Sequence, residues 1–250
     1  MMIHPTSIVS PSALIHESVK IGPFSIVHDN VEIGAGTEID AYCEIGLPTK
    51  LAISQALKIG INCKIRSHSV IYTGSQIGDE LVTGHYVCIR ENTNIKIGVQ
   101  IGSRGDIQGD CEIGQYTKMH ADVHVGKKSV VGDFVWIFPG VLLTNDAMPP
   151  SENLNGPKIG NFAVIASNAL IYPGISIGKD SVIAAGAIVK ESIESGKLAV
   201  GSPAKAICDA SILRMPNNPK LKAYPWRNRF HRGYPTDIVE GWLKDLEHNQ

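Results

Sequence analysis

The stretch VIASNALIYPGISIGKDSVIAAGAIV, residues 164–189, decides the fold of this chain. Within it an isoleucine or a valine returns every six residues, at positions 165, 171, 177, 183 and 189. A helix repeats at about 3.6 residues and a strand at about 2, so neither element explains this period. A fixed period this short is typical of a solenoid in which short parallel strands alternate with turns.

The same hexad runs through most of the chain. Its anchors, nearly all aliphatic, occupy positions 3 to 45, 59 to 143 and 159 to 189 in steps of six, and a small residue such as Ser25 or Cys111 follows four positions later. Three hexads complete one triangular coil, and successive coils stack at the strand spacing of about 4.8 Å. Glycine often follows the anchor because it tolerates the unusual backbone angles of the turn at each corner. We therefore predict an all-β fold, a parallel β-helix of about ten triangular coils.

Two insertions and a tail interrupt this pattern. The insertions are residues 47–58 and 147–158, and the anchors before them, 45 and 143, lie fifteen hexads apart. Fifteen hexads are five coils, so both loops should leave the same corner, about 24 Å apart. The period stops after residue 206. We expect a solenoid domain over 1–206 and an irregular segment over 207–250 that caps the open end and carries a helix from Thr236 to His248.

Composition limits the possible partners and the cellular compartment. The formal net charge of −1 gives no general attraction to nucleic acid or to an anionic membrane. The chain has neither the pattern of a secretory signal nor an apolar run long enough to span a bilayer. Three of its five cysteines fall on the small, inward position, where a free thiol acts as an apolar filler. A cytoplasmic protein without nucleic-acid binding or membrane insertion is expected.

Several segments resemble the hexapeptide-repeat acyltransferases, a family of left-handed parallel β-helices. IHPTSIVSPSALIHESVKIGPFSIV at 3–27 and IRENTNI at 89–95 are similar to the UDP-N-acetylglucosamine acyltransferases. VWIFPGVLLTNDAMPP at 135–150 and GSPAKAI at 201–207 look more like the nucleotide-linked amino-sugar N-acetyltransferases. The resemblance covers residues 1–206. It implies left-handed coiling, a homotrimer, and active sites in clefts between neighbouring prisms.

The resemblance also implies a reaction. An acetyl or short acyl group would pass from acetyl-CoA, or another acyl-CoA, to the amino group of a nucleotide-linked amino sugar, and no metal would take part. Acylation of a sugar hydroxyl, as in the UDP-N-acetylglucosamine enzymes, is the main alternative. A metal-dependent carbonic anhydrase on the same fold, suggested by the three histidines His85, His120 and His124, and a non-catalytic scaffold are remote alternatives.

Spacing brings candidate catalytic residues together, because residues 18 apart stack on one face. Lys127 precedes Asn145 by 18, and Lys128 precedes Asp146 by 18. We therefore predict a cluster of His124, Lys127, Asn145 and Asp146 at the foot of the 147–158 loop. In this cluster His124 would act as a general base while Asn145 and Asp146 hold the amine. The resemblance places the family's usual catalytic histidine or acid at Lys127, where a lysine would serve binding instead.

Further residues are predicted to bind the two substrates. The acceptor is assigned to Tyr72, His85, Arg90, Glu91 and Lys127, with Arg90 on a diphosphate and Tyr72 stacked on a base. The resemblance assigns coenzyme A to Ser167, Ala185, Pro203 and Lys205. The tail segment YPWRNRFHRGYP at 224–235 carries three arginines among aromatic residues, and serves either as an apolar cap with a basic edge or as a phosphate grip.

Overall fold

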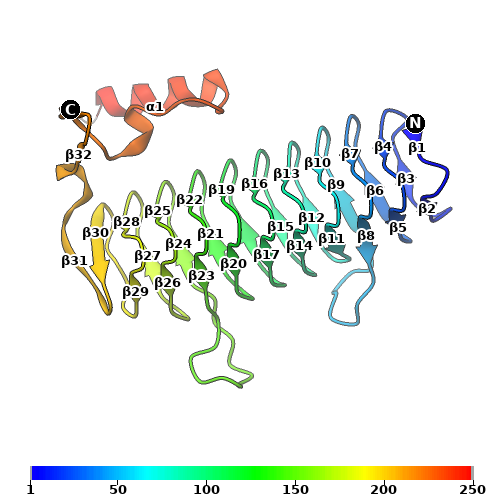
Figure 1. Cartoon of the computed structure of the whole chain (residues 1–250), viewed down its shortest axis with the longest axis horizontal. Coiled ribbons are helices and arrows are strands. Elements are labelled where there is room, and N and C mark those ends of the chain that lie inside the picture. The colour runs from blue at the N-terminus through cyan, green and yellow to red at the C-terminus, as the bar shows by residue number, and fades with distance from the viewer. Residues whose placement is uncertain (1, 249–250) are drawn as a thin grey trace.

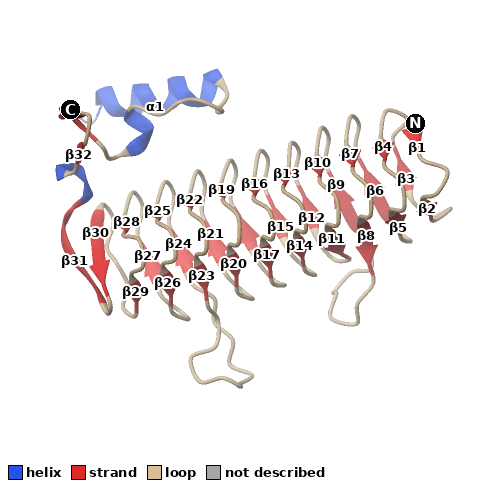
Figure 2. Ribbon diagram, viewed as in Figure 1, coloured by secondary structure: helices blue, strands red, loops and turns tan. Residues whose placement is uncertain are grey.

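Three long parallel sheets wind around one prism in the computed structural model, which describes residues 2–248 (Figures 1 and 2). The twelve strands of sheet A are β1 (Met2–Ile3), β4 (Lys20–Ile21), β7 (Glu38–Ile39), β10 (Lys64–Ile65), β13 (Val82–Thr83), β16 (Gln100–Ile101), β19 (Lys118–Met119), β22 (Trp136–Ile137), β25 (Val164–Ile165), β28 (Val182–Ile183), β30 (Lys197–Gly201) and β31 (Ala204–Asp209). The ten strands of sheet B are β2 (Ile8–Val9), β5 (Ile26–Val27), β8 (Glu44–Leu47), β11 (Val70–Tyr72), β14 (Cys88–Ile89), β17 (Asp106–Ile107), β20 (His124–Val125), β23 (Leu142–Leu143), β26 (Leu170–Ile171) and β29 (Ile188–Val189). The nine strands of sheet C are β3 (Leu14–Ile15), β6 (Val31–Ile33), β9 (Leu57–Ile59), β12 (Gln76–Ile77), β15 (Asn94–Ile95), β18 (Glu112–Ile113), β21 (Val130–Val131), β24 (Lys158–Ile159) and β27 (Ser176–Ile177).

The hexad explains this arrangement. Where no loop intervenes, strands pair in parallel with the strand 18 residues later, as Asp106 does with His124, except in the last coil, where Val182 pairs with Leu198. The anchors point into the prism, and Ile89, Ile107 and Val125 are completely buried there. The all-β parallel β-helix predicted from the sequence is confirmed, and its shape is consistent with the left-handed coiling that the resemblance implies.

Both inserted loops leave the solenoid on the same side, as the arithmetic predicts. The first follows β8 and the second follows β23, and these strands belong to sheet B with β11, β14, β17 and β20 between them. Figure 1 shows the two loops projecting in the same direction from the prism. Residues that leave sheet B toward sheet C therefore form one continuous corner, which we call the B–C corner.

The C-terminal segment adds a strand at the end of the solenoid and a helix beside it. Strand β31 pairs antiparallel with β30 and so covers the last edge of sheet A. The chain then forms a hairpin of β32 (Arg214–Met215) and β33 (Asn218–Lys222), and helix α1 (Thr236–His248) folds back along the flank of the C-terminal coils (Figure 1). The predicted helix is confirmed, and most of the segment lies along a side of the prism.

An aromatic face of the solenoid explains this placement. Phe134 and Phe162 stack at 5.0 Å, and the rings of Trp226 and Trp242 pack onto this pair. The indole nitrogen of Trp226 donates a hydrogen bond to the carbonyl oxygen of Phe162 at 3.0 Å. Burying these large rings is more favourable than leaving them in water, so the segment docks on the flank. No helix within residues 2–248 is long and apolar enough to cross a membrane.

Replacing Trp226 by alanine should detach this segment. Trp226 is 5% exposed, and truncating a buried tryptophan costs about 3–5 kcal/mol. Trypsin should then cleave within residues 224–235 much sooner, while the solenoid resists because each coil is held by its neighbours. Leu243→Ala, at an exposed position of α1, is the control and should leave the digestion pattern unchanged. Equal resistance of both variants would contradict docking through Trp226.

Candidate functional site

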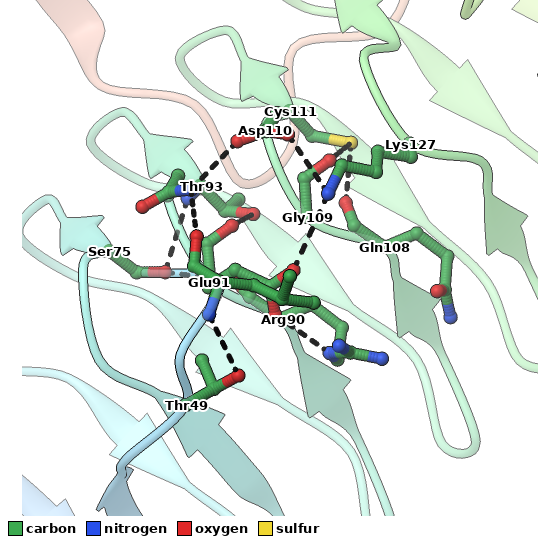
Figure 3. A network of polar contacts seen from close by, with 12 residues as sticks. Thr49, Ser75, Arg90, Glu91, Thr93, Gln108, Gly109, Asp110, Cys111 and Lys127 are labelled. Atoms are coloured by element: carbon green, nitrogen blue, oxygen red, sulfur yellow. Dashed lines mark hydrogen bonds and ion pairs between the residues drawn. The ribbon is translucent and has the colours of Figure 1, made fainter. Parts of the chain in front are cut away.

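A buried carboxylate organises the B–C corner between the two loops (Figure 3). The side chain of Glu91 is 1% exposed and contacts two cations. Arg90 donates from Nε to Glu91 Oε2 at 2.9 Å, and Lys127 Nζ lies 3.6 Å from Glu91 Oε1. Lys127 Nζ also lies 3.1 Å from Asp110 Oδ2. Two carboxylates thus balance two cations at the centre of the corner.

This pairing determines what Lys127 can do. Its side-chain nitrogen is paired with both Glu91 and Asp110, so Lys127 holds the carboxylates of the corner together. The guanidinium of Arg90 also stacks over the ring of Tyr72, with 4.9 Å to the centroid. The structure therefore brings together four of the five residues predicted to bind the acceptor: Tyr72, Arg90, Glu91 and Lys127.

Asn92 joins the first loop to this corner. Its Nδ2 donates to the carbonyl oxygen of Leu51 at 3.1 Å and to Asp110 Oδ1 at 2.8 Å. Its Oδ1 accepts from the backbone nitrogen of Ile53 at 2.9 Å. One amide side chain thus holds the 47–58 loop and the carboxylate that pairs with Lys127. The sequence analysis missed Asn92, although it lies 18 residues before Asp110 and therefore in the same column.

His124 lies on the outer face of sheet B and has a carboxylate partner. Its Nδ1 is 2.9 Å from Asp106 Oδ2 in the preceding coil. Gln108 donates from Nε2 to both oxygens of Asp106, at 2.9 and 2.8 Å. The hydrogen bond from His124 is the main reason that the pKa of Asp106 is lowered from its usual value. A carboxylate that accepts from Nδ1 leaves Nε2 free to accept a proton. The spacing of 18 could have identified Asp106.

Asp146 is engaged by its own loop. Its carboxylate accepts hydrogen bonds from the backbone nitrogens of Met148 and Ser151, at 3.0 and 2.7 Å, and from the hydroxyl of Ser151 at 2.7 Å. These bonds lower the pKa of Asp146, with the Ser151 hydroxyl contributing most. Lys127 reaches toward Glu91 and Asp110 in the coils before it. The predicted cluster is thus divided among three different sets of partners.

Asn145 adjoins the start of the second loop. Its carbonyl oxygen accepts from the backbone nitrogen of Asn155 at 2.8 Å, which closes the base of that loop. Its side chain lies against Gly126, where a Cβ would come within 3.3 Å of the Asn145 amide carbon. Asn145 therefore remains a candidate for holding a substrate group beside the loop.

The other assigned residues lie on the opposite edge of sheet B, at the turns that enter it from sheet A. His85, Ser167 and Ala185 belong to these turns, which we call the A–B corner. Pro203 lies in the turn between β30 and β31, and the ammonium of Lys205 pairs with Glu191 at 2.8 Å. Within one chain, His85 is therefore separated from the other residues assigned to the acceptor.

A second cationic surface lies between sheet A and the C-terminal segment. A groove of about 650 Å³, lined partly by Lys118, His120 and Arg232, adjoins a cavity of about 290 Å³ that includes Trp136 and Arg229. Among the described residues, none that lines either space is acidic. Burial lowers the pKa of Lys118 from its usual value, and Arg232 adds to this effect. The arginines at 229 and 232 thus face a hollow suited to an anion.

The described residues contain no evident metal site. No group of three or more histidine, cysteine, aspartate or glutamate side chains within residues 2–248 is arranged to hold an ion. His85 and His120 lie at the A–B corner, two coils apart, and His124 lies on sheet B. These three histidines therefore do not converge within one chain.

Comparison with known proteins agrees with this fold. The family model described as "Bacterial transferase hexapeptide (six repeats)" matches residues 12–47 and 156–191. The chain thus carries the hexapeptide repeat that the sequence predicts. Over 92 residues it is 28% identical to "Bifunctional protein GlmU" of Alkaliphilus metalliredigens (strain QYMF), a match that covers 35% of this chain and only 20% of that protein.

Solved structures share the architecture at low identity. The UDP-N-acetylglucosamine acyltransferase of Arabidopsis superposes with a TM-score of 0.59 and 15% identity, over 83% of this chain and 74% of that one. The Campylobacter jejuni enzyme of the same name gives 0.58 and 16%, over 98% and 83%. LpxA from Bacteroides fragilis gives 0.57 and 20%, over 92% and 80%. These similarities show a common fold.

Removing His124 should raise the pKa of Asp106 toward its usual value. The hydrogen bond from His124 is the largest contribution that lowers this pKa, and Gln108 supplies a smaller one. We expect ¹³C carboxyl titrations of His124→Ala to show Asp106 protonating at higher pH than in the wild type. Asp122, whose pKa is lowered mainly by the hydrogen bond from Arg104, is the internal control and should not move. An unshifted Asp106 would contradict the pairing.

Proposed function

We propose that this protein is an acyltransferase that moves an acetyl or short acyl group from a coenzyme A thioester to the amino group of a nucleotide-linked amino sugar. The observation that carries the proposal is the Asp106–His124 pair, which lies on a hexapeptide-repeat scaffold near a charged corner between two loops. The structural relatives named above are acyltransferases, and this shared fold adds support.

The proposed reaction requires one general base and one nucleophilic attack on the thioester. His124 Nε2 accepts a proton from the acceptor amine, and the amine nitrogen attacks the thioester carbonyl carbon. The new C–N bond forms, the C–S bond breaks, and the thiolate leaves and is protonated to the free thiol. Asp106 stabilises the imidazolium that forms at His124. Asn145 would hold the acceptor, while Asp146 would fix the loop above it.

Acylation of a hydroxyl is a second candidate, and one specific observation favours it. An alcohol needs a stronger general base than a neutral amine, and a carboxylate behind an imidazole supplies one. Asp106 stands in that position, 2.9 Å from His124. A panel of amino sugars and their hydroxyl counterparts, each linked to the same nucleotide, would separate the two reactions by the release of free thiol.

The cationic groove beside sheet A favours the binding of anionic substrates. Lys118, Arg229 and Arg232 surround it without an acidic lining residue. Phosphates of coenzyme A or of the nucleotide sugar would find charge complementarity there. Because Arg90 is paired with Glu91, a phosphate could contact only the part of its guanidinium that faces away from Glu91.

A homotrimer is part of the proposal, and the outer faces of the sheets support it. Sheet C presents charged side chains such as Glu32 and Lys58 to solvent, and the C-terminal segment covers part of sheet A. Sheet B instead presents apolar residues that no other described segment covers, namely Ile8, Ile26, Val70, Leu142, Leu170 and Ile188, with Glu44, Cys88, Asp106 and His124 among them in the same column. Tyr72, Arg90, Glu91 and Lys127 lie at one edge of this sheet and Ser167 and Ala185 lie at the other, so a neighbouring copy would complete each site.

His124→Ala should lower the rate of thiol release by about 10²–10⁴, because the amine would then lose its proton unaided. The assay uses acetyl-CoA with the amino-sugar panel and follows free thiol over a range of pH. His16→Ala, which changes an exposed imidazole on another corner, is the matched control and should keep the wild-type rate. An unchanged rate and pH profile for His124→Ala would exclude it as the base.

A charge placed on sheet B should break the assembly. Wild-type protein is expected to scatter light as three copies of the 26.9 kDa chain. Leu170→Lys introduces an ammonium that the neighbour would have to bury, so this variant should dissociate. Val130→Lys makes the same change on the outer face of sheet C and should remain assembled. A wild-type monomer at micromolar concentration would contradict the proposed trimer.

A further inference from the structure

One small cavity beside the first loop has no assigned ligand. It has a volume of about 230 Å³ and is lined by His28, Asp29, Asn30, Gly46, Pro48, Gln55 and Thr73. We propose that this cavity binds a neutral, hydroxyl-rich ring, either the ribose or the sugar of a substrate. The inference rests on the proposed function only in naming the acceptor as the molecule that carries this ring.

A local irregularity of sheet B creates the space. The register between β8 and β11 shifts by one residue, so that Tyr72 faces Leu47, and Gly46 is the residue left between the pairs. Gly46 has φ +81°, and a Cβ there would come within 2.3 Å of Val31 Cγ2 and 3.5 Å of His28 Cβ. Tyr72 and Arg90, at the corresponding places in the next two coils, carry large side chains. Glycine is therefore required at the bulge because a Cβ would clash with Val31, and this coil has no side chain at the place where the next two coils carry Tyr72 and Arg90.

The 47–58 loop forms a fixed wall of this hollow. The backbone nitrogen of Gly74 donates to the carbonyl oxygen of Ala56 at 2.8 Å, and that of Leu57 donates to Asn30 at 3.1 Å. The Asn92 side chain holds the loop near its tip. A wall held at several points keeps the polar groups of the cavity in place before a ligand arrives.

The lining favours hydroxyl groups over phosphate. Thr73 donates from Oγ1 to Gln55 Oε1 at 3.3 Å, and Gln55 donates from Nε2 to the Thr49 carbonyl oxygen at 3.0 Å. The Asn30 side-chain amide makes no hydrogen bond to another described residue and is available to a ligand. None of the lining residues is a lysine or an arginine, and Asp29 would repel an anion. Asp29 is already bonded to Ser10 and Ser12, and His28 is bonded to Glu44, so the Asn30 amide and the Gln55–Thr73 pair remain to meet the donors and acceptors of a diol.

The position of the cavity agrees with an extended acceptor. Thr73 lies in the same corner column as Glu91, Lys127 and Asn145, four coils before Asn145. Four coils correspond to about 19 Å along the axis. A nucleotide-linked sugar that lies along this corner and passes Arg90 would bring one of its rings to this cavity.

The test uses the full-length protein and two neutral probes, uridine and methyl α-D-glucopyranoside, titrated by ligand-observed NMR without an acyl donor. We expect wild-type protein to bind at least one probe, and Gln55→Leu and Thr73→Val each to weaken this binding by about tenfold. Gln76→Leu, on the outer face of sheet C, is the matched control and should bind as the wild type does. The probe that binds more tightly identifies the source of the ring.

Failure to bind either probe, or equal binding by Gln55→Leu and the wild type, would overturn the inference. Circular dichroism melting of each variant excludes unfolding as the cause of a loss. The thiol-release assay reports separately on the proposed function. Acyl transfer with an unchanged KM for the acceptor in Gln55→Leu would remove this cavity from the site and leave the activity standing. Binding of a probe without thiol release would support the cavity as a ring site and contradict the proposed acyl transfer.

Discussion

Parallel pairing of residues 18 apart places each outward side chain against its counterpart in the next coil. The pairing is held by the backbone ladder and by anchors such as Ile89 and Ile107, which are buried completely. Successive coils are one strand spacing apart, so long polar side chains readily span from coil to coil. Asp106 meets His124, and Arg104 meets Asp122, through this register alone. The candidate site is thus assembled by the same repeat that builds the core.

Burial makes one of these contacts unusual. Most coil-to-coil ion pairs here are well exposed, as between Lys20 and Glu38, and such pairs contribute little to stability. Glu91 is 1% exposed, so its charge has lost most of its water and depends on Arg90 and Lys127. Removing either cation would leave a poorly compensated buried charge, which is costly. The corner is therefore rigid, and a rigid corner is a suitable base for two loops that would position a substrate.

The periodic part of the molecule was predictable because its physics is local. The hexad fixes which residue points inward, and counting in steps of 18 gives the columns, so the shared corner of the two loops and the proximity of Glu91 to Lys127 follow from numbers alone. The direction of each side chain does not follow from these numbers. Lys127 lies one coil from both Asn145 and Asp110, and charge attraction turns it toward the acid. Asp146 lies in the expected place, but its oxygens are bound by the loop that follows it.

The place where the C-terminal segment docks could not be predicted for a related reason, since its partner is a surface and not a repeat. Phe134 and Phe162 stand one coil apart in one column and make a flat aromatic face, but the sequence does not say which later segment will cover it. The same reasoning applies to sheet B. Its outward apolar residues have no partner among the described residues, and Lys127 and Ser167 lie on opposite edges of the sheet. Rotational symmetry around an axis parallel to the prism would bury these apolar residues and bring unlike edges together in one step. If the active site is shared between copies, each copy alone would therefore have an uncovered face of this kind.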